Sequence, residues 1–484
     1  MESESGEWFN RENPADCRET VAKITHSVKE DVENAVEAAA RAFDKWRLTP
    51  APRRGEILFK TGEILKTRKE NLARIITIEM GKILLEARGE VQEAIDMCYY
   101  MAGEGRRMVG ETTPSELPDK DIKTIREPLG VIALITPWNF PIAVPSWKIL
   151  PALICGNTVV LKPASYTSYS AAVFIQCLID AGAPAGVVNL VNGSGGEIGQ
   201  HLIKHVDVKA VSFTGSTNVG FNVERTAIER HIPFMCEMGG KNAIIVLDDA
   251  DISLAVNGAL WGGYGTTGQR CTAASRLIVQ DSVFDEFEKK LIEKVKNLKL
   301  GSGLDESVTT GPLVSETQRR RVHEYTRIGI EEGARLIIGG KYYTGKGCEN
   351  GYFYEPTLFD NVSPDMRIAR EEIFGPTVAL IECKNFDEAI HIANGTDYGL
   401  SLSIYTTDVN KSAVAERELQ SGIVYINAPT IGAEIHAPFG GVKNTGLLHK
   451  EAGGRGGAVD FYSRVKVVYR DYSSRLQRAQ IDTG

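Results

Sequence analysis

The sequence predicts an α/β fold with two parallel-sheet domains and a small additional β element. The chain has 484 residues, several times the length of one typical domain. From about residue 131 onward, short runs rich in Val and Ile alternate with segments of helical length, which is the pattern of parallel sheets covered by helices. Two segments, "DIKTIREP" at 121 and "RVKVVYRD" at 464, instead alternate polar and apolar residues, as half-exposed strands do.

The first hundred residues are expected to form helices. The segment "VKEDVENAVEAAARAFDKW" has acidic residues near its start. Its apolar residues recur at helical spacing, at Val32, Val36, Ala39, Ala40 and Phe43. Strands are then expected at two series of apolar runs. The first is "VIALITP" at 131, "NTVVLKP" at 157, "GVVNLVNG" at 186, "AVSFTGS" at 210 and "NAIIVLD" at 242; the second is "SRLIVQD" at 275, "ARLIIGG" at 334, "TVALIEC" at 377, "LSIYTTD" at 402 and "GIVYINAP" at 422. The two domains would meet near residue 245.

Composition and charge exclude several classes of protein. The formal net charge is -8, which disfavours nucleic acid and anionic membranes as partners. The most apolar stretch, 131–161, is interrupted by four prolines and by polar residues, so no membrane-spanning helix is expected. The acidic start "MESESGEWFN" resembles neither a secretory signal nor a transit peptide, and none of the eight cysteines forms a CxxC pair. A cytoplasmic protein with reduced thiols is expected.

The ends of the predicted strands carry the candidate motifs. Open α/β sheets bind ligands at the carboxyl ends of their strands, and here these ends read "TPWNFP", "KPAS", "GSGGEIG" and "GSTNVG". A glycine-rich turn before a helix N-terminus can face a phosphate. Each motif alone is usually an ordinary turn, but their occurrence on successive strands favours a nucleotide site. His201 and His205 stand four apart without further clustered ligands, so no metal site is expected.

Two residues could carry chemistry. Cys271 lies in "GYGTTGQRCTAAS", where small residues leave room to reach its sulfur, so it is either a nucleophile or a small core residue. Glu237 lies in "CEMGGKN" beside an apolar run. It is either a desolvated carboxylate suited to act as a general base or an acid held in a salt bridge.

Taken together, the motifs resemble the aldehyde dehydrogenase superfamily. "TPWNFP", "LKPAS", "FTGSTNVG", "EMGGKN", "GQRCTAASR", "EEIFGP" and "PFGGVKNTG" occur in the order and spacing of that superfamily, from about residue 5 to 480. The resemblance implies a cofactor-binding domain (1–117 and 137–245), a catalytic domain (246–450), and oligomerisation strands with a tail (118–136 and 451–484). It also implies a homo-oligomer, either dimer or tetramer, with a small-molecule aldehyde as substrate.

The resemblance also assigns residue roles. It implies Cys271 as the nucleophile, Glu237 as the general base, and Asn139 as the side-chain donor to the oxyanion. The cofactor would be held by Trp138, Lys162, Ser165, Gly195, Gly215, Ser216, Glu372 and Phe374. Trp147 and Phe439 would line the aldehyde tunnel, with Arg270 a candidate anchor for an anionic substrate. The implied reaction passes through a thiohemiacetal and a thioester to the carboxylic acid.

One departure from the family bears on the cofactor. Many relatives have "KPAE", whose glutamate grips the 2′-hydroxyl of NAD, whereas position 165 is serine here. A carboxylate would repel a 2′-phosphate and a hydroxyl can donate to it. NADP is therefore expected as the preferred cofactor, with NAD as the alternative.

The substrate is predicted only from subgroup features. "YYMAGEGRR" at 99 and the tail "DYSSRLQRAQID" resemble a subgroup that oxidises α-ketoglutaric semialdehyde, also called 2,5-dioxovalerate. The alternatives are D-glyceraldehyde and succinic semialdehyde. From another class, a cysteine-dependent thioester hydrolase or acyl-transferase could use the same thiol. A non-catalytic protein on this scaffold would not need Cys271, Glu237 and Asn139 together.

Overall fold

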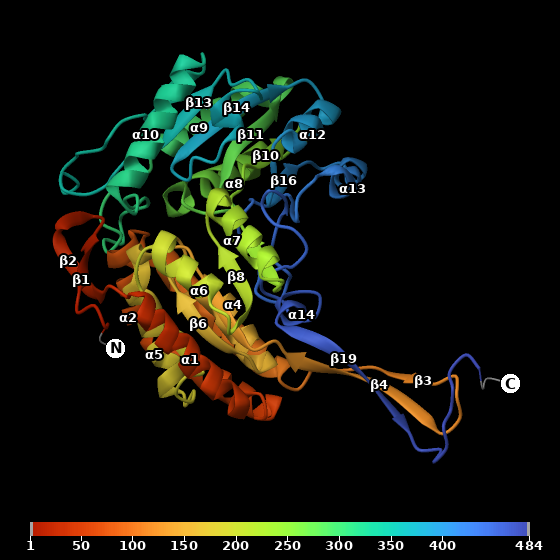
Figure 1. The fold of residues 1–484 in the computed structure, drawn as a ribbon. Helices are drawn as coiled ribbons and strands as arrows, with labels where there is room; N and C mark the ends of the chain where they lie inside the picture. The colour runs from red at the N-terminus through yellow and green to blue at the C-terminus, as the bar shows by residue number, and fades with distance from the viewer. Residues whose placement is uncertain (1–2, 482–484) are drawn as a thin grey trace.

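The computed structural model describes residues 3–481 and contains two large sheets with helices around each (Figure 1). The five-stranded sheet has the order β7-β6-β5-β8-β9 and is parallel throughout. Its strands are β5 (Val131–Ile135), β6 (Thr158–Lys162), β7 (Val188–Leu190), β8 (Val208–Thr214) and β9 (Phe234–Glu237). The alternating pattern therefore predicted the α/β class correctly, although β9 was not foreseen.

The second sheet has seven strands in the order β12-β13-β14-β11-β10-β16-β17. It is parallel except for the antiparallel pair β12–β13 at one edge. Its strands are β10 (Asn242–Val246), β11 (Ala274–Gln280), β12 (Arg335–Ile338), β13 (Thr357–Asp360), β14 (Thr377–Cys383), β16 (Ser401–Tyr405) and β17 (Ile423–Ile426). Its helices are α8 (Ile252–Tyr264), α9 (Asp281–Lys296), α10 (Glu316–Glu331), α11 (Arg367–Arg370), α12 (Phe386–Asn394) and α13 (Val409–Glu418).

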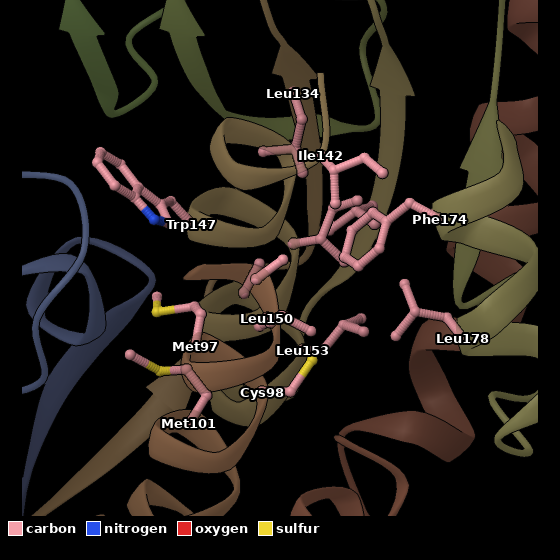
Figure 2. Packing of buried hydrophobic residues seen from close by; sticks show 14 of the residues in the cluster. Met97, Cys98, Met101, Leu134, Ile142, Trp147, Leu150, Leu153, Phe174 and Leu178 are labelled. Carbon is pink, nitrogen blue, oxygen red and sulfur yellow. The ribbon is translucent and has the colours of Figure 1, made fainter. Parts of the chain in front are cut away.

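Seven helices pack against the five-stranded sheet. These are α1 (Lys29–Trp46), α2 (Ala51–Met80), α3 (Leu84–Glu104), α4 (Ala143–Cys155), α5 (Ser168–Asp180), α6 (Gln200–Lys204) and α7 (Thr217–Glu229). Helices α6 and α7 and most of α1 pack in a smaller core, and α2 to α5 contribute most helical residues of the largest core. Figure 2 shows Met97, Leu150 and Phe174 in this core, from α3, α4 and α5 respectively. Because α4 is buried along its whole length, its position and that of the loop before it are fixed by packing on both sides.

The N-terminal segment differs from the all-helical prediction. Residues Trp8–Asn13 (β1) and Asp16–Thr25 (β2) form an antiparallel hairpin before α1 begins. Half of the β2 residues are exposed and only Ile24 is buried, so the strand carries no apolar periodicity in the sequence. The buried guanidinium of Arg11 donates to the carbonyls of Glu79, at the end of α2, and Val314, just before α10. The hairpin thereby connects the two halves of the molecule (Figure 1).

Two predicted domain boundaries do not coincide with the sheets. The range 118–136 includes β5, which is buried at the centre of the five-stranded sheet because all its residues are apolar. β10 begins at Asn242 and pairs with β11 and β16, so the chain enters the second sheet before residue 246. The chain therefore passes from the five-stranded sheet to the seven-stranded sheet in the four residues after Glu237.

The two alternating segments are strands, as predicted, and they pair with each other. β4 (Lys120–Pro128) and β19 (Ser463–Asp471) pair antiparallel, and β3 (Thr112–Pro114) adds a short third strand. This sheet projects from the body (Figure 1). The remaining short elements are β15 (Tyr398–Gly399), β18 (Val442–Lys443) and α14 (Ala458–Phe461). Within residues 3–481, no helix is both long enough and apolar enough to cross a membrane.

Candidate active site

A cavity of about 390 Å³ lies between the two sheets, at the carboxyl ends of β5, β6 and β8. Twelve predicted site residues line it: Trp138, Asn139, Trp147, Lys162, Gly195, Gly215, Ser216, Arg270, Cys271, Glu372, Phe374 and Phe439. They come from both halves of the chain and are brought together here. Glu237 and Ser165 are not among the residues that line this space.

The turn before Cys271 is held in an unusual backbone conformation. Thr266, Thr267 and Gly268 all have positive φ, at 52°, 57° and 67°. Such angles are costly for threonine, so the surroundings must impose them. The backbone N–H of Thr266 donates to Glu86 Oε1 at 2.7 Å, and the Thr267 hydroxyl donates to the carbonyl of Gly311 at 3.0 Å. These bonds fix the turn and so the direction in which residue 271 leaves it.

The Cys271 thiol is un-ionised in the resting site. Burial raises the pKa of the Cys271 thiol to about 12, and the carboxylates of Glu372, Glu451 and Glu237 act in the same direction. The carbonyl of Cys271 accepts a bond from Asn242 Nδ2 at 2.7 Å, which ties the residue to the start of β10. Because the thiolate is the nucleophile, its formation needs a proton acceptor or a change in the surroundings.

The raised pKa of the Cys271 thiol predicts how its alkylation rate depends on pH. In the cofactor-free protein, the rate at which iodoacetamide modifies Cys271 should climb with pH through 8.5 and beyond, because the thiolate fraction keeps rising toward about pH 12. The rate is followed by mass spectrometry of the peptide that carries residue 271, with Cys271→Ser as the blank. A plateau at pH 8 to 9 would show that the thiol ionises normally.

The amide of Asn139 is positioned close to the cysteine loop. Asn139 is 4% exposed, and its Nδ2 donates to the carbonyl of Gln269 at 3.1 Å. Gln269 is itself fixed, because its Oε1 accepts the backbone N–H of Val314 at 3.0 Å. An amide carries two N–H groups, so one remains for a ligand after the bond to Gln269.

The carboxyl of Glu237 lies behind the cavity wall, at the end of β9. It is 2% exposed, its Oε2 accepts the backbone N–H of Gly441 at 3.0 Å, and its Oε1 has no partner among the described residues. A Cβ at Gly440 would collide with Oε1, and one at Gly446 would come within 3.0 Å. Both glycines therefore leave room for the carboxyl group.

Burial raises the pKa of Glu237 well above its usual value, and the Glu451 carboxylate adds to the effect. The Gly441 N–H and the ammonium groups of Lys450 and Lys148 oppose it. Burial thus favours the protonated form of the Glu237 carboxyl over its carboxylate. Any proton acceptance by this group requires the pH to rise, or the carboxyl group to move toward water.

A buried ion pair next to Glu237 was missed by sequence reasoning. Lys148 Nζ binds Glu451 Oε1 and donates to the Ser212 hydroxyl at 2.7 Å, and both charged side chains are buried. Glu451 lines the cavity, and its Oε2 has no partner in the described part of the chain. The sequence offered one indication of this pair. Lys148 lies in the middle of the apolar stretch 131–161, and a lysine that is buried there needs a carboxylate partner.

The cofactor side of the cavity presents donors. α7 begins after Ser216, whose side chain makes no capping bond, so the first N–H groups of the helix remain free to face an anion. Lys162 is 4% exposed, its Nζ donates only to the carbonyl of Pro163, and burial lowers the pKa of Lys162 to about 8. Ser165 Oγ donates to the carbonyl of Gly193 at 2.9 Å. The uncapped start of α7 and the two remaining N–H groups of Lys162 fit a nucleotide phosphate.

The opposite wall carries Glu372 and Phe374. Glu372 Oε1 accepts the backbone N–H of Gly240 at 3.1 Å, and the absence of a side chain at Gly239 allows this approach. Phe374 has a positive φ of 62° and is held by Gln318, whose amide donates to its carbonyl at 2.7 Å. The rings of Trp138 and Phe374 meet edge-on, 5.3 Å apart. Gln318, a polar residue on α10, also lines the cavity and was not predicted.

The aldehyde side is mainly aromatic. The rings of Trp147 and Phe439 lie 4.9 Å apart. Arg270 lines the cavity, but its guanidinium is occupied: it donates to the Thr266 hydroxyl at 2.8 Å and lies 3.5 Å from a Glu86 carboxylate oxygen. It also stacks between Phe140 and Trp261. Arg270 therefore has little free capacity to anchor a substrate carboxylate.

Comparisons with known proteins agree with this geometry. The Aldehyde dehydrogenase family profile matches residues 1–468. The alpha-ketoglutaric semialdehyde dehydrogenase of Bacillus subtilis is 44% identical over 469 residues, covering 97% of this chain and 96% of the relative. The 2,5-dioxopentanoate dehydrogenase of Saccharolobus solfataricus is 42% identical, covering 97% of each chain. A crystal structure of betaine aldehyde dehydrogenase from Staphylococcus aureus in complex with NAD+ has a TM-score of 0.95 and 35% identity, covering 98% of this chain and 94% of that one.

The family match spans nearly the whole sequence, and the TM-score of 0.95 shows the same overall fold. This chain therefore belongs to the aldehyde dehydrogenase family and is an NAD(P)-dependent oxidoreductase that acts on aldehydes.

Proposed function

We propose that the protein oxidises α-ketoglutaric semialdehyde to the dicarboxylic acid, with NADP as preferred cofactor and NAD as the alternative. The observation that carries the proposal is the 44% identity, across almost the whole chain, to a relative named for this substrate. Succinic semialdehyde and D-glyceraldehyde are the other candidates, since a relative from Escherichia coli named for succinate semialdehyde and NADP(+) is 39% identical.

In the proposed mechanism, the Cys271 thiolate adds to the aldehyde carbon. The second N–H of Asn139 and the backbone N–H of Cys271 stabilise the oxyanion of the thiohemiacetal. When bound, the nicotinamide supplies the hydride acceptor that turns this adduct into a thioester. Glu237 then takes a proton from the water that hydrolyses the thioester. The buried Glu237 carboxyl, which is near enough to act electrostatically on the Cys271 thiol, supports hydrolysis as the last step rather than acyl transfer to another thiol.

The cofactor would lie along the cavity. Lys162, Ser165, Gly195, Gly215 and Ser216 would hold its adenosine and diphosphate end, and Trp138, Glu372 and Phe374 its nicotinamide end. The Lys162 ammonium, which among residues 3–481 has no carboxylate partner and bonds only the carbonyl of Pro163, and the uncapped start of α7 support this placement. In this assignment the five-stranded sheet belongs to the cofactor-binding domain and the seven-stranded sheet to the catalytic domain.

Replacing Ser165 by glutamate should shift the preference toward NAD. A carboxylate at this position would repel a 2′-phosphate and accept a bond from a 2′-hydroxyl, so kcat/KM with NADP should fall on the order of tenfold or more. The control is Ser165→Ala, which removes the hydroxyl without adding charge and should change the ratio less. An NADP/NAD ratio that is the same in Ser165→Glu and wild type would contradict the cofactor proposal.

We also propose a homo-oligomer, dimer or tetramer, in the cytoplasm. The projecting sheet exposes apolar side chains of Ile125, Val465, Val467 and Tyr469. Its outer strands β19 and β3 have unpaired edges, which favour pairing with another chain. The reduced thiol that the mechanism requires is consistent with a cytoplasmic location.

The decisive experiment is a substrate panel. α-Ketoglutaric semialdehyde, succinic semialdehyde, D-glyceraldehyde and simple alkanals are assayed with both cofactors, and kcat/KM is compared. We expect α-ketoglutaric semialdehyde with NADP to give the highest value. A higher value for another aldehyde would replace the proposed substrate, and thioester hydrolysis without any cofactor reduction would favour the hydrolase alternative.

A further inference from the structure

The aldehyde end of the cavity contains two polar groups with no protein partner. Glu93, on α3, lines the cavity and makes no hydrogen bond or ion pair with any residue between 3 and 481. The indole Nε1 of Trp147, on α4, also lines it, is buried and has no acceptor among these residues. Figure 2 shows this nitrogen at the edge of the apolar core, on the side of Met97. Met97 lies one helical turn beyond Glu93.

Unpartnered buried polar groups are costly, so natural proteins keep few of them without a purpose. The Trp147 N–H is such a group, and the half-buried carboxyl of Glu93, which also has no protein partner among the described residues, lines the same cavity, so the geometry favours a ligand that meets both. Convergent polar groups in a mainly apolar pocket are the usual means of fixing a ligand's orientation. The aromatic walls of Trp147 and Phe439 would hold the carbon chain, and the two polar groups would meet its far end.

The cations near Glu93 are committed to other acids. Lys82 Nζ lies 2.6 Å from Glu90 Oε2, with both side chains fully buried. Arg270 is engaged by Glu86 and Thr266. Neither cation is therefore free to hold an anionic substrate.

Burial raises the pKa of Glu93 to about 8, and the neighbouring Glu90 and Asp96 act in the same direction, against Lys82 and Arg270. At neutral pH the Glu93 carboxyl is thus mostly un-ionised. An un-ionised carboxyl can donate its O–H, whereas a carboxylate can only accept.

We propose that Glu93 is a specificity-determining residue that, together with Trp147 Nε1, donates a hydrogen bond to the terminal carboxylate of an anionic aldehyde. The inference rests on the proposed function, because it assumes that the aldehyde carbon is held at Cys271. Two neutral donors can bind a carboxylate without a buried cation. Once Glu93 ionises, its carboxylate repels the same substrate group and discriminates against it.

The test compares two aldehydes of equal length that differ in charge. Succinic semialdehyde carries a terminal carboxylate, and butyraldehyde ends in a methyl group. The ratio of their kcat/KM values is measured from pH 6.5 to 9.5. Because both aldehydes react at the same thiol, the titration of Cys271 and Glu237 cancels in the ratio. In the wild-type enzyme, the ratio should be constant below about pH 8 and fall toward tenfold per pH unit above it.

Two substitutions of Glu93 distinguish the loss of its hydrogen-bond donor from the loss of its negative charge. Glu93→Gln keeps a neutral N–H donor and should make the ratio independent of pH. Glu93→Ala should lower the ratio at pH 7 by roughly tenfold or more, since a hydrogen bond to a charged group is lost. The control is Glu229→Gln, an exposed acid on α7 outside the cavity and not among the charges that act on Glu93, which should leave the ratio and its pH dependence unchanged.

Each outcome bears on one proposal. A pH-independent ratio in the wild-type enzyme, or a fall that persists in Glu93→Gln, would overturn the role of Glu93. A ratio that rises above pH 8, or a preference for a cationic aminoaldehyde over butyraldehyde that is lost in Glu93→Gln, would show that Glu93 acts as an acceptor and would also overturn it. Failure of the wild-type enzyme to oxidise either aldehyde would instead count against the proposed function.

Discussion

Cys271→Ser is expected to abolish aldehyde oxidation while leaving the fold and cofactor binding intact. A serine hydroxyl is a much weaker acid than a thiol, so it supplies almost no nucleophilic anion in a site that already disfavours the thiolate. We expect kcat/KM to fall on the order of 10⁴-fold or more, as for other catalytic nucleophiles. The measurement is the steady-state rate of NAD(P)H formation at saturating cofactor.

Cofactor binding supplies the control for this variant. The change is small, because the serine Oγ would occupy the place of the Cys271 Sγ, so the Kd for NADPH should stay within about twofold of wild type by fluorescence titration. Oxidation at the wild-type rate would exclude Cys271 as the nucleophile. The other seven cysteines would then have to be replaced in turn, beginning with Cys236, which adjoins the proposed base.

Glu237→Gln is expected to trap the enzyme as a thioester. Glutamine cannot accept a proton, so hydrolysis should slow by about 10²–10⁴-fold while the first turnover proceeds. Mass spectrometry of the intact protein after mixing with aldehyde and cofactor should then show the mass of one acyl group. A burst of NAD(P)H equal to the enzyme concentration should precede a slow steady state.

The pH dependence distinguishes a base from a merely structural carboxyl. Because the pKa of Glu237 is raised, its carboxylate forms only as pH increases, so deacylation should speed up with pH in the wild-type enzyme. This dependence should vanish in Glu237→Gln. Glu229→Gln, at an exposed position on α7, is the matched control and should behave as wild type. Unchanged deacylation in Glu237→Gln would refute the proposed base.

The sequence predicted those parts of the fold that depend on local apolar patterning. All ten apolar runs proposed as strands are strands, and the helices from residue 29 to 104 are present. β1 and β2 could not be predicted, because few of their side chains are buried and long-range contacts such as Arg11 to Val314 hold them. The domain boundary near 245 was misplaced because the apolar run of β10 is equally compatible with either sheet.

The site was predicted where a motif carries it and missed where it depends on tertiary contacts. The loops with Asn139 and Cys271 meet as expected, since both follow motifs at the strand and loop ends. The pair Lys148–Glu451 joins residues that are 303 positions apart, and no local pattern announces it. Arg270 looked available as an anchor, but Glu86 on a distant helix already engages it. Long-range electrostatics is thus the part of this site that sequence alone did not reveal.

The N-terminal hairpin gives residues far from the thiol a mechanical influence on turnover. Arg11 ties α2 on one side of the cleft to the segment that leads into α10 on the other. Removal of the first dozen residues by a protease, or their distortion by a fused tag, would break these hydrogen bonds of Arg11. The two sides of the cleft could then move relative to each other. Preparations that differ only at their N-terminus would then differ in catalytic rate, although every residue that touches the aldehyde is the same.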